Sequence, residues 1–106
     1  MPKYMIEGSY SAQGVQGVKA KGGSSRRDAV AETIRGLGGE MESFYFAFGD
    51  SDVYVTADLP DNEAAAAVAL AVNSAGAVAA KTVVLLTPEE IDRAAERSVT
   101  YQPPGG

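Results

Sequence analysis

Neither cysteine nor histidine occurs among the 106 residues of the chain, and tryptophan is absent as well. Without cysteine there are no disulfides, no thiolate nucleophile and no thiolate ligands for zinc, haem iron or iron–sulfur clusters. Without histidine there is no catalytic triad of the Ser-His-Asp kind and no imidazole metal ligand. Only hard cations held by carboxylates, such as Mg²⁺ or Ca²⁺, remain compatible with this composition. We predict no metal site and no cofactor.

Positive charge is also scarce, since the chain has 9 Lys and Arg residues and 14 Asp and Glu residues, which gives a net charge of −5. Binding to a nucleic-acid backbone needs clustered basic residues, so we expect no nucleic-acid partner. No apolar run approaches the roughly 20 residues that cross a bilayer, so we expect no membrane partner. The first residues, MPKYMIEGSY, lack the long apolar core of a signal peptide. We therefore expect a cytoplasmic protein.

The length fits a single domain with a core of its own, which we expect over residues 1–100, followed by a disordered YQPPGG tail over residues 101–106. Period-two patterns and β-branched runs predict strands over residues 3–10, 40–48, 53–59 and 77–86. Capping residues predict helices that begin near Ser11, Ser25, Asp61 and Thr87. Two β-α-β halves around a central hairpin predict a ferredoxin-like α+β sandwich with a four-stranded antiparallel sheet and an extra C-terminal helix.

Apolar side chains occur on both faces of the expected sheet, where a lone sandwich would alternate apolar and polar residues. In the strand over residues 40–48, one face is expected to carry Phe44, Phe46 and Phe48, and the other Met41, Tyr45 and Ala47. The helix over residues 64–75 is apolar enough to predict cover on more than one side. Such surfaces mark interfaces, so we expect a homodimer or higher homo-oligomer. In the alternative, the C-terminal helix folds back over the open sheet face.

Three segments carry a family resemblance: PKYMIEGSYSAQG at residues 2–14, LGGEMESFYFAFGDSDVYVTADLPDNEAAAAVALAVNSAG at residues 37–76, and TVVLLTPEEID at residues 82–92. Over roughly residues 2–95 the chain resembles the GYD-domain family of small bacterial and archaeal proteins. The family turn usually holds Gly, an acidic residue, Tyr and Asp, and here the turn is Gly49, Asp50, Ser51 and Asp52, with serine in place of tyrosine. The resemblance implies relation to the dimeric α/β-barrel group, in which two ferredoxin-like sheets pack face to face, and it implies no activity.

The acidic glycine turn supplies the first candidate site. Asp50 and Asp52 are a possible carboxylate pair that acts as a base or a cation site, and Asp52 is the candidate catalytic residue. The more common role of Asp in such a turn is to accept hydrogen bonds from nearby backbone amides.

Aromatic and basic side chains supply the other candidates. Candidate ligand-binding residues are Tyr4, Tyr10, Tyr45, Phe46 and Tyr54, although such rings more often lie at the rim of a core or in an interface. The basic residues Lys19, Lys21, Arg26 and Arg27 gather near a predicted helix start, where they are either an anion site or, more commonly, a solvated segment.

Two function classes remain open. The first is a small oligomeric module that binds a small, partly apolar ligand or serves assembly. The second is a cofactor-independent monooxygenase, isomerase or cyclase that acts on an aromatic or polyketide-like substrate, with Asp52 as the base and a tyrosine to orient the substrate. The second class rests on analogy with the dimeric α/β-barrel group, and fold alone does not define function.

Overall fold

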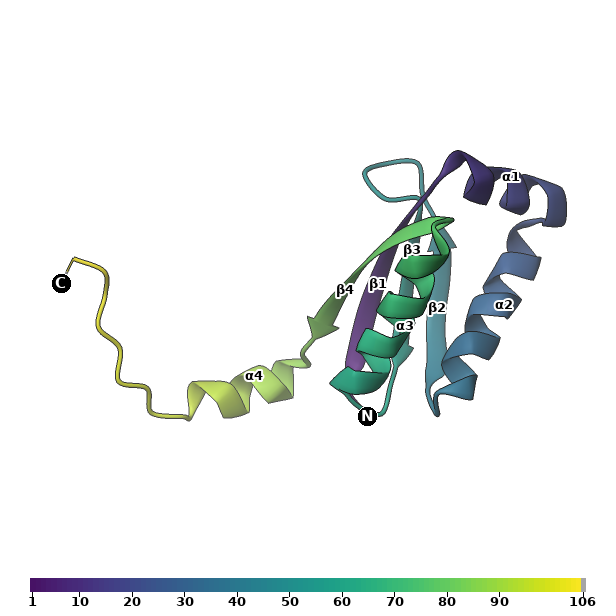
Figure 1. Cartoon of the computed structure of the whole chain (residues 1–106). Coiled ribbons are helices and arrows are strands. Elements are labelled where there is room, and N and C mark those ends of the chain that lie inside the picture. The colour runs from purple at the N-terminus through teal and green to yellow at the C-terminus, as the bar shows by residue number, and fades with distance from the viewer. Residues whose placement is uncertain (106) are drawn as a thin grey trace.

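The computed structural model describes residues 1–105, and Gly106, the last residue of the predicted tail, lies outside the described residues. Eight elements follow one another along the chain (Figure 1). They are β1 (Lys3–Tyr10), α1 (Ala12–Lys21), α2 (Gly23–Gly36), β2 (Glu40–Phe46), β3 (Val53–Asp58), α3 (Asn62–Ala75), β4 (Val78–Leu85) and α4 (Pro88–Ala95).

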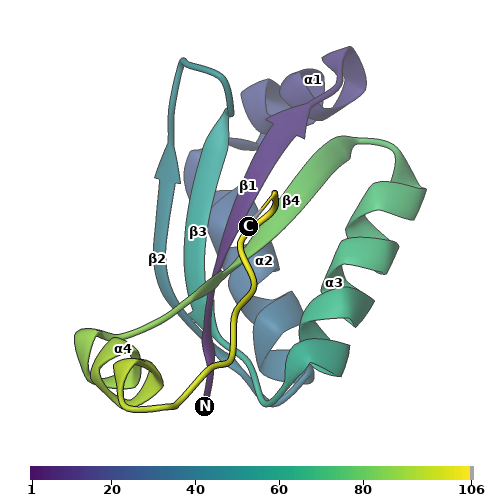
Figure 2. The same ribbon diagram turned by 90° about the vertical axis from the view of Figure 1, so that its left-hand side faces the viewer.

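The four strands form one antiparallel sheet in the order β2-β3-β1-β4. Helices α2 and α3 lie on one face of this sheet, and Figure 2 views the opposite, open face. The predicted α+β class and the four-stranded antiparallel sheet are therefore confirmed. The β-α-β-β-α-β order is present, with the first crossover divided between α1 and α2.

The core lies between the central strands and the two helices. Tyr4, Ile34 and Leu59 are its largest fully buried side chains, and they pack with Val55 and Ala57 of β3. The hydroxyl of Tyr4 donates a hydrogen bond to Asn62 Oδ1 at 2.6 Å, so this buried polar group is satisfied at the start of α3.

Two of the predicted helix starts, those of α3 and α4, are confirmed by their capping hydrogen bonds. The Asp61 carboxylate accepts from the Ala64 amide at 2.9 Å and caps α3. At α4, Thr87 Oγ1 accepts from the Glu90 amide while Glu90 Oε1 accepts from the Thr87 amide, which is the reciprocal pair of a capping box. The hydrogen bond from the Thr87 backbone lowers the pKa of the Glu90 carboxyl.

The first crossover differs from its prediction. The helical turn expected after Ser11 is a ten-residue helix, α1, in which Ser11 Oγ accepts from the Gly14 amide at 3.2 Å. Ser25 was wrongly predicted to cap the second helix, because α2 already begins at Gly23. Gly22 separates the two helices with φ of 89°, a conformation that glycine adopts without the steric cost of a Cβ.

The aromatic strand also departs from strict alternation. A β-bulge between Met41 and Ser43 places an extra residue in β2, so Met41 lies opposite the core residue Ala57 on the helix side. The prediction that Met41 shares a face with Tyr45 is therefore wrong, since a bulge inverts the alternation beyond it. Phe48 is wrongly placed as well, because β2 ends at Phe46 and the Phe48 ring is fully exposed in the following loop.

The C-terminal helix does not fold back over the sheet. Helix α4 buries none of its residues and projects, together with the segment after it, away from the body on the side of the open face (Figures 1 and 2). The outer side of α3 is likewise uncovered within a single chain, where Leu70 is 73% exposed. Helix α3 was predicted to be covered on more than one side, and residues 1–105 of one chain do not provide the second cover.

Candidate functional site

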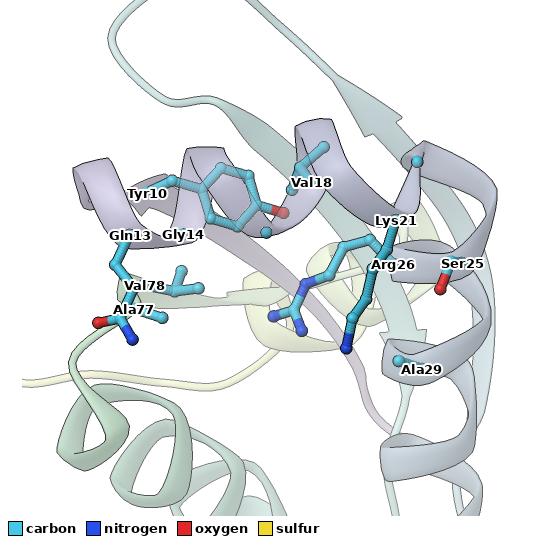
Figure 3. Close-up of a pocket in the computed structure, with 12 residues that line it drawn as sticks. Tyr10, Gln13, Gly14, Val18, Lys21, Ser25, Arg26, Ala29, Ala77 and Val78 are labelled. Carbon is cyan, nitrogen blue, oxygen red and sulfur yellow. The ribbon is translucent and has the colours of Figure 1, made fainter.

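The space between the sheet and its helices is hollowed at two places. The first, which we call the sheet hollow, has a volume of about 320 Å³ and lies between β1, α2 and α3. The second, the helix hollow, has a volume of about 350 Å³ and lies between α1, the start of α2 and the start of β4 (Figure 3). Clefts of about this volume are typical of small-molecule sites, which makes the two hollows the candidate site.

Small side chains on facing elements leave the sheet hollow open. Gly8 of β1 is paired with Ala80 of β4, and Ala71 and Ala75 face them from α3. Larger apolar side chains form the remaining walls, among them Ile6, Phe44, Val68 and Val72. A Cβ on Gly8 would lie 2.8 Å from Val53 Cγ1, so even alanine would crowd this wall.

The two hollows adjoin each other. Their common lining consists of Tyr10, Arg26, Ala29, Ala77 and Val78. The helix hollow is the more polar of the two, with Gln13, Lys21 and Ser25 in its walls. In Figure 3 the side chain of Arg26 extends from the corner between α1 and α2 toward Tyr10, and the side chain of Lys21 extends from the same corner beside Arg26.

Arg26 is the most unusual group at this junction. Its guanidinium carbon lies 6.0 Å from the centroid of the Tyr10 ring, within the range of a cation–π contact. Its Nε atom is buried and has no hydrogen-bond partner among the described residues. None of the ion pairs between residues 1–105 includes Arg26, whereas the neighbouring Arg27 pairs with Asp28 at 3.1 Å.

Of the predicted ligand-binding aromatics, only Tyr10 lies in the described walls of the hollows. Tyr10 lines both hollows, and the Phe46 ring lies beside it with centroids 6.5 Å apart. Tyr4 is in the core, while Tyr45 and Tyr54 are cross-strand neighbours on the open face. The predicted set therefore divides among three environments.

Hydrogen bonds between Asp52 and the backbone of β1 hold the acidic turn against the end of that strand. Asp52 Oδ2 accepts from the Tyr10 amide at 2.8 Å, and the Asp52 amide donates to the Gly8 carbonyl at 2.8 Å. Ser51 is 8% exposed, and the Asp50 carbonyl accepts from Ser9 Oγ at 3.5 Å. Asp52 is not part of the lining of either hollow, and its carboxylate serves as a backbone acceptor next to Tyr10.

Comparison with known protein families identifies the family of the chain. The family model of the GYD domain matches residues 4–95. The chain belongs to the GYD domain family. This confirms the resemblance of the three quoted segments, and the matched region runs from the second residue of β1 to the last residue of α4. No curated protein and no solved structure matches the chain significantly.

Family membership therefore supplies no activity or ligand for this GYD domain, and the chemistry must be argued from its own side chains. Among residues 1–105 no group of three or more acidic side chains lies close enough together to hold a metal ion. None of the helices described for these residues has the length and hydropathy required to cross a bilayer.

In the GYD turn, we expect replacement of Asp52 by asparagine to lower the stability of the fold only slightly and replacement by alanine to lower it more. Asparagine keeps an oxygen that can accept from the Tyr10 amide, so the free energy of unfolding should change by no more than about 1 kcal/mol. Alanine leaves that amide without its acceptor and should cost about 1–3 kcal/mol. Urea denaturation measures both variants. Equal losses in the two would show that the charge of Asp52 matters, rather than its acceptor geometry.

Most residues that line the two hollows of the GYD domain could not be identified from the sequence. Ala29 and Ala80 carry no chemical signal, and their role follows only from the way the helices are placed over the sheet. Gly8 did carry a signal, because glycine in a strand interior often marks a site of close approach. Arg26 was considered only as one of four basic residues, and the structure separates it from the solvent-exposed Arg27.

Proposed function

We propose that this GYD domain is a homo-oligomeric module that binds a small, partly apolar molecule in the two adjoining hollows between its sheet and helices. The observation that supports binding is the junction of the two hollows. There an apolar space between β1, α2 and α3 opens onto the polar atoms of Tyr10 and Arg26. Ligand sites are typically apolar concavities of about 300–1,000 Å³ with a few convergent polar groups.

Binding is better supported than catalysis. A cofactor-independent enzyme acting on an aromatic or polyketide-like substrate would need a base in contact with that substrate. No carboxylate lines either hollow among the described residues, and histidine is absent from the chain. The Asp52 carboxylate is already engaged by the Tyr10 amide.

Filling the junction should abolish ligand binding. Ala29 lines both hollows from α2 but is itself exposed, so a larger side chain at this position can be accommodated without disturbing the core. We expect the wild-type protein to bind the neutral fluorophore N-phenyl-1-naphthylamine and Ala29→Phe to weaken that binding at least about tenfold, since the ring occupies the dye's place. Fluorescence titration measures the affinity, and circular dichroism confirms the fold.

The matched control is Ala66→Phe, which adds the same ring to an exposed position of α3 outside both hollows. It should bind the dye as the wild type does. A wild-type protein that fails to bind the dye, or equal affinities of the two phenylalanine variants, would contradict the proposed site.

The assembly part of the proposal rests on the C-terminal arm, by which we mean α4 and the residues that follow it, 88–105. Helix α4 has no buried residue, and Ile91 on its apolar stripe is 51% exposed. The radius of gyration is 16.8 Å, whereas a compact chain of this length has about 13 Å. An amphipathic helix held away from its own domain is best explained by a second copy of the chain that receives it.

The open sheet face offers the surface for that second copy. Tyr45 and Tyr54 lie side by side on it, and Val83 of β4 is 41% exposed. At one end of the face the Lys3 amine bonds Glu42 at 2.7 Å and Asp58 at 3.0 Å, which raises the pKa of Lys3 and lowers the pKa of Glu42. Apolar centres with polar rims are typical of interfaces, so we propose that two sheets pack face to face as in the dimeric α/β-barrel group.

A further inference from the structure

We infer that the molecule bound in the hollow is an amphipathic acid, whose anionic group is held by Arg26 and whose apolar body fills the sheet hollow. This inference rests on the proposed function and adds the chemical class of the ligand.

The state of Arg26 supports the anionic group. A guanidinium N–H that is removed from water without an acceptor is costly, and the Nε atom of Arg26 is in that position among the described residues. The Tyr10 ring interacts with the guanidinium, but a ring contact does not replace a hydrogen-bond acceptor for Nε. A carboxylate accepts from Arg in a two-pronged geometry and satisfies this need.

The charges around the junction favour the same group. Lys21 supplies a second cation to the helix hollow. Neither hollow is lined by a described Asp or Glu side chain, although acidic residues outnumber basic ones in the whole chain. An anion beside Arg26 therefore meets no carboxylate in the described walls, and Lys21 adds a second positive charge on the side of the helix hollow.

The walls of the sheet hollow define the rest of the ligand. Ile6, Phe44, Val68 and Val72 present hydrocarbon, and the volume of about 320 Å³ is suited to an aryl group or a medium-length acyl chain. Because Arg26 and Tyr10 line both hollows, one molecule can place its apolar part there while its anion contacts the guanidinium.

Two related dyes test the inference. The anionic dye 8-anilinonaphthalene-1-sulfonate and the neutral N-phenyl-1-naphthylamine share the same aryl amine, and only the first carries a charge. We expect Arg26→Leu to weaken binding of the anionic dye at least about tenfold, the scale of one charge-assisted hydrogen bond, and to change binding of the neutral dye by less than about twofold. Arg26→Gln, which keeps polar character, should show the same loss and serves if the leucine variant does not fold.

The matched control is Arg27→Leu. Arg27 is the next residue of α2, its side chain is 52% exposed, and it lines neither hollow. Its replacement removes the same charge from the protein, so any change in binding that arises from net charge alone appears in both variants. We expect the affinities for both dyes to stay within about twofold of the wild type.

The outcomes separate this inference from the proposed function. If the wild-type protein binds the neutral dye but its affinity for the anionic dye does not depend on Arg26, the proposed binding site is supported and the anionic ligand class is wrong. If loss of Arg26 weakens both dyes equally, the side chain supports the walls and the inference is again overturned. If neither dye binds the wild type, the proposed function itself fails.

Discussion

Truncation of the chain after Thr87 is expected to convert a homo-oligomer into a monomer. The truncation removes the C-terminal arm, whose apolar side chains, such as Ile91, are exposed in the single chain and would be covered by another copy in the proposed assembly. Light scattering at micromolar concentration should give the full-length protein a mass of at least twice 10.9 kDa and the truncated protein a monomer mass.

A shorter truncation provides the control. Removal of residues 101–106 takes away the Pro- and Gly-rich tail and leaves α4 in place, so the assembly should persist and stability should change by less than about 0.5 kcal/mol. A full-length mass of 10.9 kDa would rule out the oligomer. A truncated protein that stays oligomeric would assign the assembly to the sheet face instead of the arm.

Replacing Leu59 by alanine is expected to cause the largest loss of stability. Leu59 is 0% exposed and lies against the backbone at Gly39, where an added Cβ would stand 2.8 Å from Leu59 Cδ2. The cavity left by alanine should cost about 3 kcal/mol, which lowers the melting temperature of a domain of this size by at least about 12 °C. Calorimetry measures the shift.

The same substitution at Leu70 is the matched comparison. Leu70 is 73% exposed on the outer side of α3, so its loss should cost less than about 0.5 kcal/mol in the arm-truncated monomer. If Leu70→Ala is as harmful as Leu59→Ala, the outer side of α3 is covered by packing that the single chain does not show.

The sequence predicted those elements whose signals are local. Asp61 and the Thr87–Glu90 pair mark helix starts because a side-chain acceptor within three residues suffices to cap a helix. The alternation of residues 3–10 likewise located β1, since a strand with one buried face needs period two. These signals, taken in order, were enough to give the four-stranded antiparallel sheet.

Features that depend on a partner strand were missed. The bulge between Met41 and Ser43 exists because β2 must stay in register with β3, and nothing within β2 alone marks the extra residue. The start of α2 was misplaced for a similar reason, because the chain turns at Gly22 and the first residue of α2 then packs near Phe46 of a distant strand.

The sequence by itself determined the class of fold, the family and the absence of thiol and imidazole chemistry, because composition and local pattern suffice for these. Only the tertiary structure decided which side chains share a space. Arg26 and Arg27 are adjacent and chemically identical, but the docking of α2 on the sheet places one at the junction of the hollows and leaves the other in solvent beside Asp28. The helix period of about 100° per residue turns neighbouring side chains in different directions, so burial depends on packing and not on residue type.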